Sequence, residues 1–230
     1  MIYLDYAANT PADPLVLEAF CEITKKYIAN PNSHYVIGLE ANAKLLESTE
    51  QISSLLGVKG TEIIYTSGAS EANNLAIKGV ATKYRNRGKH IITTFLEHSS
   101  VNGSLAYLEN EGYEIDYVDI LPNGLINLDH LKELLRDDTI LVSICYVDSE
   151  IGIRQDIQKI SDLLKSHSCI FHVDATQAVG KINVSTENVD LMTFAPHKFF
   201  GLNGSGVLIK KENILIEPQI HAYFCLQVHQ

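Results

Sequence analysis

The chain has 230 residues, which is enough for one large domain with a sizeable core. Hydrophobic residues make up 46% and charged residues 20%, a composition that excludes a disordered chain, a collagen-like repeat and a coiled coil. The formal net charge is -10 and no basic cluster is present, so nucleic acid is not expected as a partner. The longest apolar stretch, residues 140–147, is too short to cross a bilayer, and we expect a cytoplasmic protein without membrane contact.

The cysteines are widely spaced and contain no C-x-x-C pair. This argues against a disulfide scaffold and against a thiolate metal site, so no metal is predicted. Most of them are expected to be small buried hydrophobic residues. The four positions are Cys21, Cys145, Cys169 and Cys225.

Two helices are expected before any strand. The first begins after Asp13, which can cap it, and continues to about residue 27. The second covers about 39–56 and ends at a glycine. Three residues of the second helix are expected to face inward: Leu45, Ile52 and Leu56.

Strands and helices then alternate, which is typical of an α/β fold with a mostly parallel sheet between helices. Seven strands are predicted: 63–66, 90–94, 114–119, 140–147, 169–174, 191–194 and 206–210. Helices are predicted between them at 71–84, 99–111, 128–135 and 156–165. We expect one large domain over 1–221, including an N-terminal segment 1–12, and a divergent tail at 222–230.

Five junctions at strand ends carry polar residues that packing does not require. In such a sheet, ligands bind beyond the carboxyl ends of the strands. The first junction, 66–71, has small residues before a helix, whose unpaired N–H groups attract an anion. It predicts a phosphate cradle, and an ordinary Ser-capped helix start is the alternative.

The next two junctions follow the second and fourth strands. His98 lies where an imidazole can stack on a ring or move a proton, although a hydrogen-bonded loop histidine is the alternative. Asp148 and Ser149 follow the fourth strand, where a capped turn is the alternative.

The last two junctions supply a carboxylate and an amine. Asp174 ends the fifth strand, and a buried carboxylate needs a cationic partner. No Lys or Arg is close in sequence, so the protonated ring nitrogen of a cofactor is a candidate partner. Lys198 lies in a Gly-rich turn, either as a solvated cation or as a desolvated amine that attacks a carbonyl.

Taken in order, six segments resemble the signature of the cysteine desulfurase family, within the class-V aminotransferases. The segments are 4–11, 66–74, 97–98, 149–152, 172–177 and 197–198. The resemblance extends to about residue 221. It implies the large domain of a fold-type I enzyme that uses pyridoxal 5'-phosphate and works as a homodimer.

The resemblance also implies roles for individual residues. Lys198 would form the Schiff base with the cofactor aldehyde, and Asp174 would keep the ring nitrogen protonated so that the ring accepts electrons. His98 would stack on the ring as the second catalytic residue. The remaining cofactor contacts would come from these residues: Ala69, Ser70, Ser149, Gln177 and His197.

Several positions depart from the family pattern. Ala195 stands where the family has a phosphate-binding Ser, and Ser149 stands where it has Asn. His34 lies one residue earlier than the family's His. After residue 221 the likeness fails, so we expect most of the small C-terminal domain to be missing, with its nucleophilic Cys, its substrate-binding Arg and a Thr that reaches the partner subunit. None of the four cysteines matches that nucleophile.

The leading hypothesis is therefore a cysteine desulfurase-like protein that acts on a cysteine-like amino acid and passes sulfur to an acceptor protein. The same signature is similar to that of selenocysteine lyase and other class-V relatives. A second hypothesis is a non-catalytic remnant that forms a heterodimer with a full-length paralogue. A nucleotide-binding domain is disfavoured, because neither G-x-G-x-x-G after the first strand nor a Walker sequence occurs.

Overall fold

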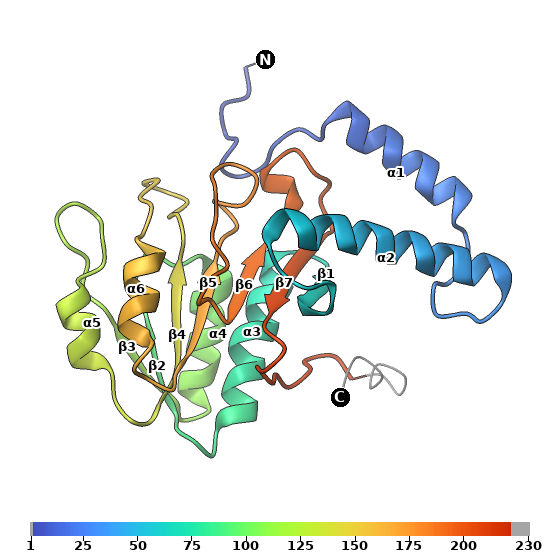
Figure 1. Ribbon diagram of the computed structural model, residues 1–230. Coiled ribbons are helices and arrows are strands. Elements are labelled where there is room, and N and C mark those ends of the chain that lie inside the picture. Colours follow the sequence, from blue (N-terminus) through green and yellow to red (C-terminus); the bar gives the residue numbers. More distant parts are fainter. Residues whose placement is uncertain (1, 222–230) are drawn as a thin grey trace.

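The computed structural model describes residues 2–221 as helices packed on a single seven-stranded sheet (Figure 1). The strands are β1 (Ile63–Thr66), β2 (His90–Thr93), β3 (Glu114–Tyr117), β4 (Thr139–Cys145), β5 (Ile170–Asp174), β6 (Leu191–Phe194) and β7 (Gly206–Lys210). The helices are α1 (Pro14–Lys26), α2 (Val36–Leu56), α3 (Ala69–Tyr84), α4 (Ser99–Asn110), α5 (Leu128–Leu134) and α6 (Ile157–Leu164), with 3-10 turns η1 (Gly60–Glu62) and η2 (Pro196–Lys198). The predicted number of seven strands is confirmed, although β3 and β4 each end two residues earlier than predicted.

The strand order across the sheet is β1-β7-β6-β5-β4-β2-β3. Only β7 is antiparallel to its neighbours, β1 and β6, while every other pairing is parallel. Since β1 is antiparallel to β7 and β7 is antiparallel to β6, β1 points in the same direction as β6 and the other parallel strands. The carboxyl ends of β1, β2, β4, β5 and β6 therefore lie at one edge of the sheet.

Each face of the sheet is covered by its own apolar layer. Helices α3 and α4 pack on one face with residues such as Ile91 and Leu208. Helices α5 and α6 pack on the other face with residues such as Ile92 and Phe171. Since neighbouring strand residues such as Ile91 and Ile92 point to opposite faces, the strands contain nearly continuous apolar runs.

The two N-terminal helices extend beyond the sheet (Figure 1). Asp13 caps α1 as predicted, accepting a hydrogen bond from Leu15 N–H at 2.8 Å, yet no residue of α1 is buried. On α2, Ile52 packs on the core, whereas Leu45 is 42% exposed. The prediction that Leu45 faces inward was wrong, because only the C-terminal part of α2 reaches the sheet.

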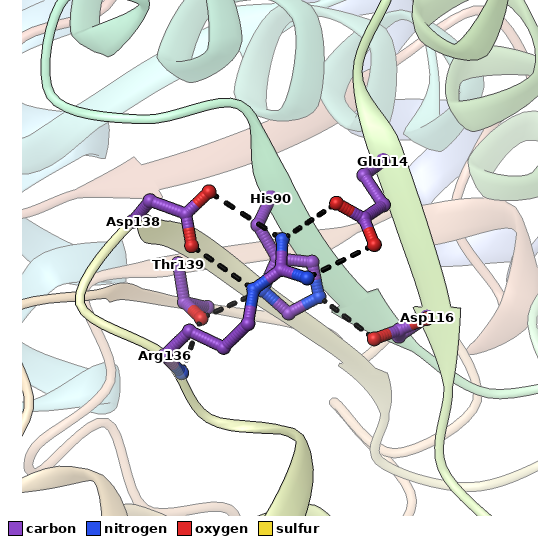
Figure 2. Close-up of polar contacts among 6 residues, drawn as sticks. All are labelled: His90, Glu114, Asp116, Arg136, Asp138 and Thr139. Carbon is purple, nitrogen blue, oxygen red and sulfur yellow. Dashed lines mark hydrogen bonds and ion pairs between the residues drawn. The ribbon is translucent and has the colours of Figure 1, made fainter.

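A polar cluster joins the starts of β2, β3 and β4, at the sheet edge away from the strand carboxyl ends (Figure 2). Six residues form it: His90, Glu114, Asp116, Arg136, Asp138 and Thr139. The fully buried His90 ring contacts Thr139 Oγ1 at 2.7 Å and Asp116 Oδ2 at 3.1 Å. Arg136 donates to both carboxylate oxygens of Glu114, at 2.9 and 2.8 Å. The cluster ties the edge strand β3 to the interior of the sheet.

The cysteines differ in their environments. Cys145 is buried and Cys169 half-buried, but Cys21 lies exposed on α1, so the expectation of burial fails there. Cys225 and the predicted tail 222–230 lie outside the described residues. Within residues 2–221, no helix has the length and apolar character that a bilayer span requires.

Candidate functional site

A cavity of about 640 Å³ lies at the carboxyl ends of the strands. It is lined by residues that follow β1, β2, β4, β5 and β6, together with part of the N-terminal segment. Every cofactor contact expected from the sequence lies on its wall: Ala69, Ser70, His98, Ser149, Asp174, Gln177, His197 and Lys198. The fold thus brings together side chains that are up to about 130 positions apart in the chain.

Asp174 is the last residue of β5 and is 5% exposed. Its Oδ2 accepts a hydrogen bond from Asn73 Nδ2 at 2.8 Å, and its Oδ1 accepts one from the Thr176 N–H at 3.0 Å. Both donors are neutral, and no Lys, Arg or His in residues 2–221 forms an ion pair with it. The carboxylate is therefore oriented by the protein while its charge is left for another partner.

Lys198 ends η2, on the turn that follows β6. Its Nζ donates to the backbone carbonyls of Ala7 at 2.9 Å and Ala8 at 2.7 Å. Partial burial lowers the pKa of Lys198 below its usual value, against the opposing charges of Asp174 and Asp5. A lowered pKa increases the fraction of neutral amine, the form that attacks a carbonyl carbon.

The N-terminal segment holds the Lys198 turn in place. The Thr10 N–H and hydroxyl both donate to His197 O at 2.9 Å, and Thr10 Oγ1 accepts the Phe200 N–H at 2.6 Å. The Asp13 N–H donates to Phe200 O at 2.9 Å. Phe200 has a φ of 67°, a left-handed conformation that is unfavourable for a bulky residue and needs support from such contacts. We call these contacts between residues 10–13 and 197–200 the N-terminal clamp.

His98 begins α4 as its N-cap and is exposed to the cavity. Its Nδ1 accepts a hydrogen bond from the Ser100 N–H at 3.1 Å and contacts Ser100 Oγ at 2.8 Å. A backbone N–H can only donate, so Nδ1 carries a lone pair and the neutral ring carries its proton on Nε2. His98 is therefore hydrogen-bonded within its own turn and also faces the cavity, so the two alternatives that the sequence left open are compatible.

The start of α3 supplies the wall beside β1. The helix begins at Ala69, two residues before the predicted start, so Ala69 and Ser70 lie in its first turn, where N–H groups lack helical partners. The loop before it packs closely on β7, because a Cβ on Gly206 would lie 2.4 Å from the carbonyl carbon of Gly68. Close packing by glycine brings the helix start to the cavity.

Gln177 and Ser149 complete the set of predicted contacts. Gln177 Nε2 donates to Ala7 O at 2.9 Å, and its Oε1 accepts from Lys181 Nζ at 2.6 Å. Ser149 is half-buried, and its hydroxyl lies 3.4 Å from Glu150 Oε1. Gln177 is therefore held by two hydrogen bonds, whereas Ser149 makes one long side-chain contact within the described residues.

Three further polar residues at the site received no role from the sequence. Cys145 lines the cavity beside Asp174, its register partner on β5. Glu97 lies buried behind it, and burial raises the pKa of Glu97 to about 8. Asn73 is fully buried on α3, in the same stripe as Ala76, Ile77 and Val80. A polar residue inside an apolar helical stripe is a signal that could have identified Asn73.

Comparison with known proteins agrees with this geometry. The family model described as aminotransferase class-V matches residues 2–220, so the chain belongs to that family. Its curated relatives are cysteine desulfurases. It is 46% identical to cysteine desulfurase IscS of Edwardsiella ictaluri and 45% identical to IscS of Klebsiella pneumoniae, in each case over 96% of this chain and 56% of the relative.

Solved structures show the same fold. A NifS-like protein superposes with a TM-score of 0.94 at 35% identity, over 96% of this chain and 62% of the other. SspA, solved in complex with cysteine, superposes with a TM-score of 0.91 at 34% identity, over 96% and 65%. The chain thus spans little more than half the length of the curated relatives that it matches.

Class-V aminotransferases and cysteine desulfurases are pyridoxal phosphate enzymes, and the residues present fit that cofactor. An aldehyde needs an amine of lowered pKa, which Lys198 provides. A protonated ring nitrogen needs an acceptor without a competing cation, which Asp174 provides. A phosphate is favoured at a helix N-terminus, where N–H groups lack helical partners, and α3 begins at Ala69 and Ser70.

Proposed function

We propose that this chain binds pyridoxal 5'-phosphate in the cavity and carries the large-domain part of a cysteine desulfurase site. The observation that supports this most directly is that Lys198 and Asp174 line the same cavity, with Asp174 free of any ion pair within the described chain. When bound, the cofactor supplies an electron sink for the negative charge that develops at the substrate Cα.

The roles of this chain's residues follow from their positions. Lys198 would hold the aldehyde covalently through its amine. Asp174 would keep a proton on the ring nitrogen, and His98, with its proton on Nε2, would stack on the ring. Gln177 would donate its second amide hydrogen to the phenolic oxygen.

The phosphate would be held beside β1. Ala69 and Ser70 would present backbone N–H groups, and His197 would add an imidazole donor. Burial and the neighbouring Lys198 charge lower the pKa of His197. Ser149 would contact the ring region through its hydroxyl, and Ala195 offers no hydroxyl where the family has one.

Cofactor binding is tested by the absorbance of the purified protein after addition of pyridoxal 5'-phosphate. We expect a yellow chromophore that borohydride bleaches and that Lys198→Ala abolishes. The matched control is Lys210→Ala, because Lys210 on β7 also has a pKa lowered by burial but does not line the cavity. The proposal fails if the wild-type chain stays colourless, or if Lys198→Ala keeps the borohydride-sensitive chromophore.

For the reaction, we propose conversion of a cysteine-like amino acid, with transfer of its sulfur to an acceptor protein, as in a cysteine desulfurase. Selenocysteine lyase is the alternative within the same class. With a thiol such as dithiothreitol added to supply the two electrons that reduce the released sulfur or selenium, sulfide and alanine from L-cysteine, compared with selenide and alanine from selenocysteine, separate the two. Absence of both products with a bound cofactor would rule out catalysis by the chain alone.

A second candidate is a partner of a full-length relative, and the exposed apolar helix α1 favours it. Its exposed residues include Leu15, Val16 and Phe20, and such a surface is typical of an interface. We propose a homodimer or such a heterodimer. Mixing the chain with a full-length desulfurase and measuring mass and activity distinguishes them.

We also propose a cytoplasmic location, because the cysteines that the structure describes, Cys21, Cys145 and Cys169, are free thiols. Detection of the protein in a periplasmic or secreted fraction would contradict it.

A further inference from the structure

Asn73 is a fully buried amide on α3, one turn into the helix that borders the cavity. A primary amide in an apolar layer is costly unless its hydrogen-bonding groups find partners. Its surroundings in the helical stripe are Ala76, Ile77 and Val80, which can supply none. The partners therefore come from three other elements of the fold.

Each amide group of Asn73 has a defined partner. Its Nδ2 donates to Asp174 Oδ2 at 2.8 Å and to Ser100 Oγ at 2.9 Å. Its Oδ1 accepts the Thr193 hydroxyl at 2.5 Å. Both hydrogens of Nδ2 are therefore used, one on β5 and one on α4.

The direction of these hydrogen bonds is fixed by chemistry. An ionised carboxylate only accepts, so the amide must present Nδ2 to Asp174. The opposite orientation would place Oδ1 against a carboxylate oxygen and Nδ2 against a hydroxyl that already faces His172 Nε2 at 3.4 Å. Burial lowers the pKa of His172 below its usual value, against the opposing charge of Asp174, so that ring is neutral near pH 7.

The result at Asp174 is a carboxylate held from both sides by neutral donors. Asn73 binds Oδ2 and the Thr176 N–H binds Oδ1, so the group cannot rotate without losing one of them. Neutral donors orient a carboxylate without cancelling its charge. The charge is left facing the cavity.

We propose that Asn73 is a positioning residue that aims Asp174 at the ligand and thereby makes the cavity select a ring with a protonated nitrogen. This inference deepens the proposed function and rests on it. The same amide reaches Ser100, whose Oγ contacts His98 Nδ1 at 2.8 Å, so one side chain links the two residues proposed to contact the ring.

The test compares two ligands that differ only at the ring nitrogen: pyridoxal 5'-phosphate and its carbocyclic analogue, in which a benzene ring replaces the pyridine. Both carry the phosphate, the phenolic oxygen and the aldehyde. Only the first can pair with Asp174 through the ring. The ratio of the two dissociation constants, measured by absorbance titration, reports the contribution of that pair alone.

In the wild type we expect tighter binding of pyridoxal 5'-phosphate than of the analogue. Asn73→Asp puts a second carboxyl at hydrogen-bond distance from Asp174, where two carboxyls share one proton. We expect the preference to fall by about tenfold or more, the equivalent of one pKa unit. Asn73→Ala removes the hydrogen-bond donor without adding charge, and it should also reduce the preference for pyridoxal 5'-phosphate. This variant tests the inference if Asn73→Asp does not fold.

The matched control is Asn110→Asp on α4, where the amide only donates to Ala106 O at 2.9 Å on the exposed surface. It should keep the wild-type ratio. The inference is overturned if the folded Asn73 variants keep the wild-type ratio even though both affinities fall, since that describes a structural role alone. A wild type that binds neither ligand refutes the proposed function itself, which is a different result.

Discussion

Glu97 gives a stability prediction that requires no ligand. It is 6% exposed, and its Oε1 accepts from Thr94 Oγ1 and from the Cys145 N–H, both at 2.8 Å. Its Oε2 is buried without a hydrogen-bond partner in the described chain. Burial raises the pKa of Glu97 from 4.5 to about 8, with the nearby Asp174 charge acting in the same direction.

Because the pKa of Glu97 is raised in the folded state, the free energy of unfolding decreases as the pH increases. Between pH 4.5 and about 8 the unfolded chain has released the Glu97 proton while the folded chain still holds it. The associated stability is fully present below this window and is lost as the pH rises through it, at about 1.4 kcal/mol per pH unit. The total loss is about 5 kcal/mol, for a pKa that moves from 4.5 to about 8.

The variant Glu97→Gln removes this titration, because an amide stays neutral at every pH. We expect the stability of the variant relative to the wild type to increase by several kcal/mol between about pH 5 and pH 9. Urea unfolding at a series of pH values measures the difference. Glu133→Gln, at an exposed glutamate on α5, is the matched control and should show no such trend. A difference between Glu97→Gln and wild type that stays constant across the range would refute the reasoning.

Three further predictions concern packing and polar contacts. Thr10→Val removes the hydroxyl of the N-terminal clamp and leaves the Phe200 N–H without its acceptor. It should lower the free energy of unfolding, measured in urea, by about 1–3 kcal/mol. Gly206→Ala places a Cβ 2.4 Å from Gly68 and should cost about 1–3 kcal/mol or more, seen as a lower melting temperature. Arg136→Ala should cost only about 1 kcal/mol, since its pair with Glu114 is partly exposed, and the cost should shrink at high salt.

Each of these has its own contradicting result. Gly103→Ala is the control for Gly206→Ala, because a Cβ on Gly103 meets nothing within 4 Å. If both glycine variants melt alike, the close approach is not the cause. Thr10→Val with unchanged stability would show that the clamp is dispensable, and a salt-independent Arg136→Ala effect would exclude electrostatics as its origin.

Most strand positions could be predicted from the sequence, since the runs such as 191–194 and 206–210 are apolar on both faces and end at turn residues. The strand order could not. The position of β1 beside β7 depends on pairing between segments more than 100 positions apart, such as Ile63 with Ile209, which no local pattern encodes. The prediction that Leu45 faces inward was wrong for a related reason. Helical spacing shows which residues share a face, but not whether another element covers that face.

The residues that line or support the cavity also differ in how far the sequence indicates them. Lys198 and Asp174 stand out because a Gly-rich turn and a strand exit make their polarity unexpected. Thr10 gave no such signal, because its partners His197 and Phe200 lie 187 and 190 positions away. Asn73 did leave a signal in the sequence, as a polar residue within an apolar helical stripe. Glu97 was part of a recognisable segment, but only the folded protein reveals that its carboxyl is enclosed.

The N-terminal clamp affects the order in which parts of the protein fold. The contacts of Thr10 with His197 and Phe200 close loops of 187 and 190 residues. During synthesis residue 10 leaves the ribosome before residues 197–200, so this closure is possible only after the segment between them has been made. The Lys198 turn is therefore among the last parts of the described chain to be immobilised, and cleavage within residues 7–13 by a protease would remove contacts that hold it.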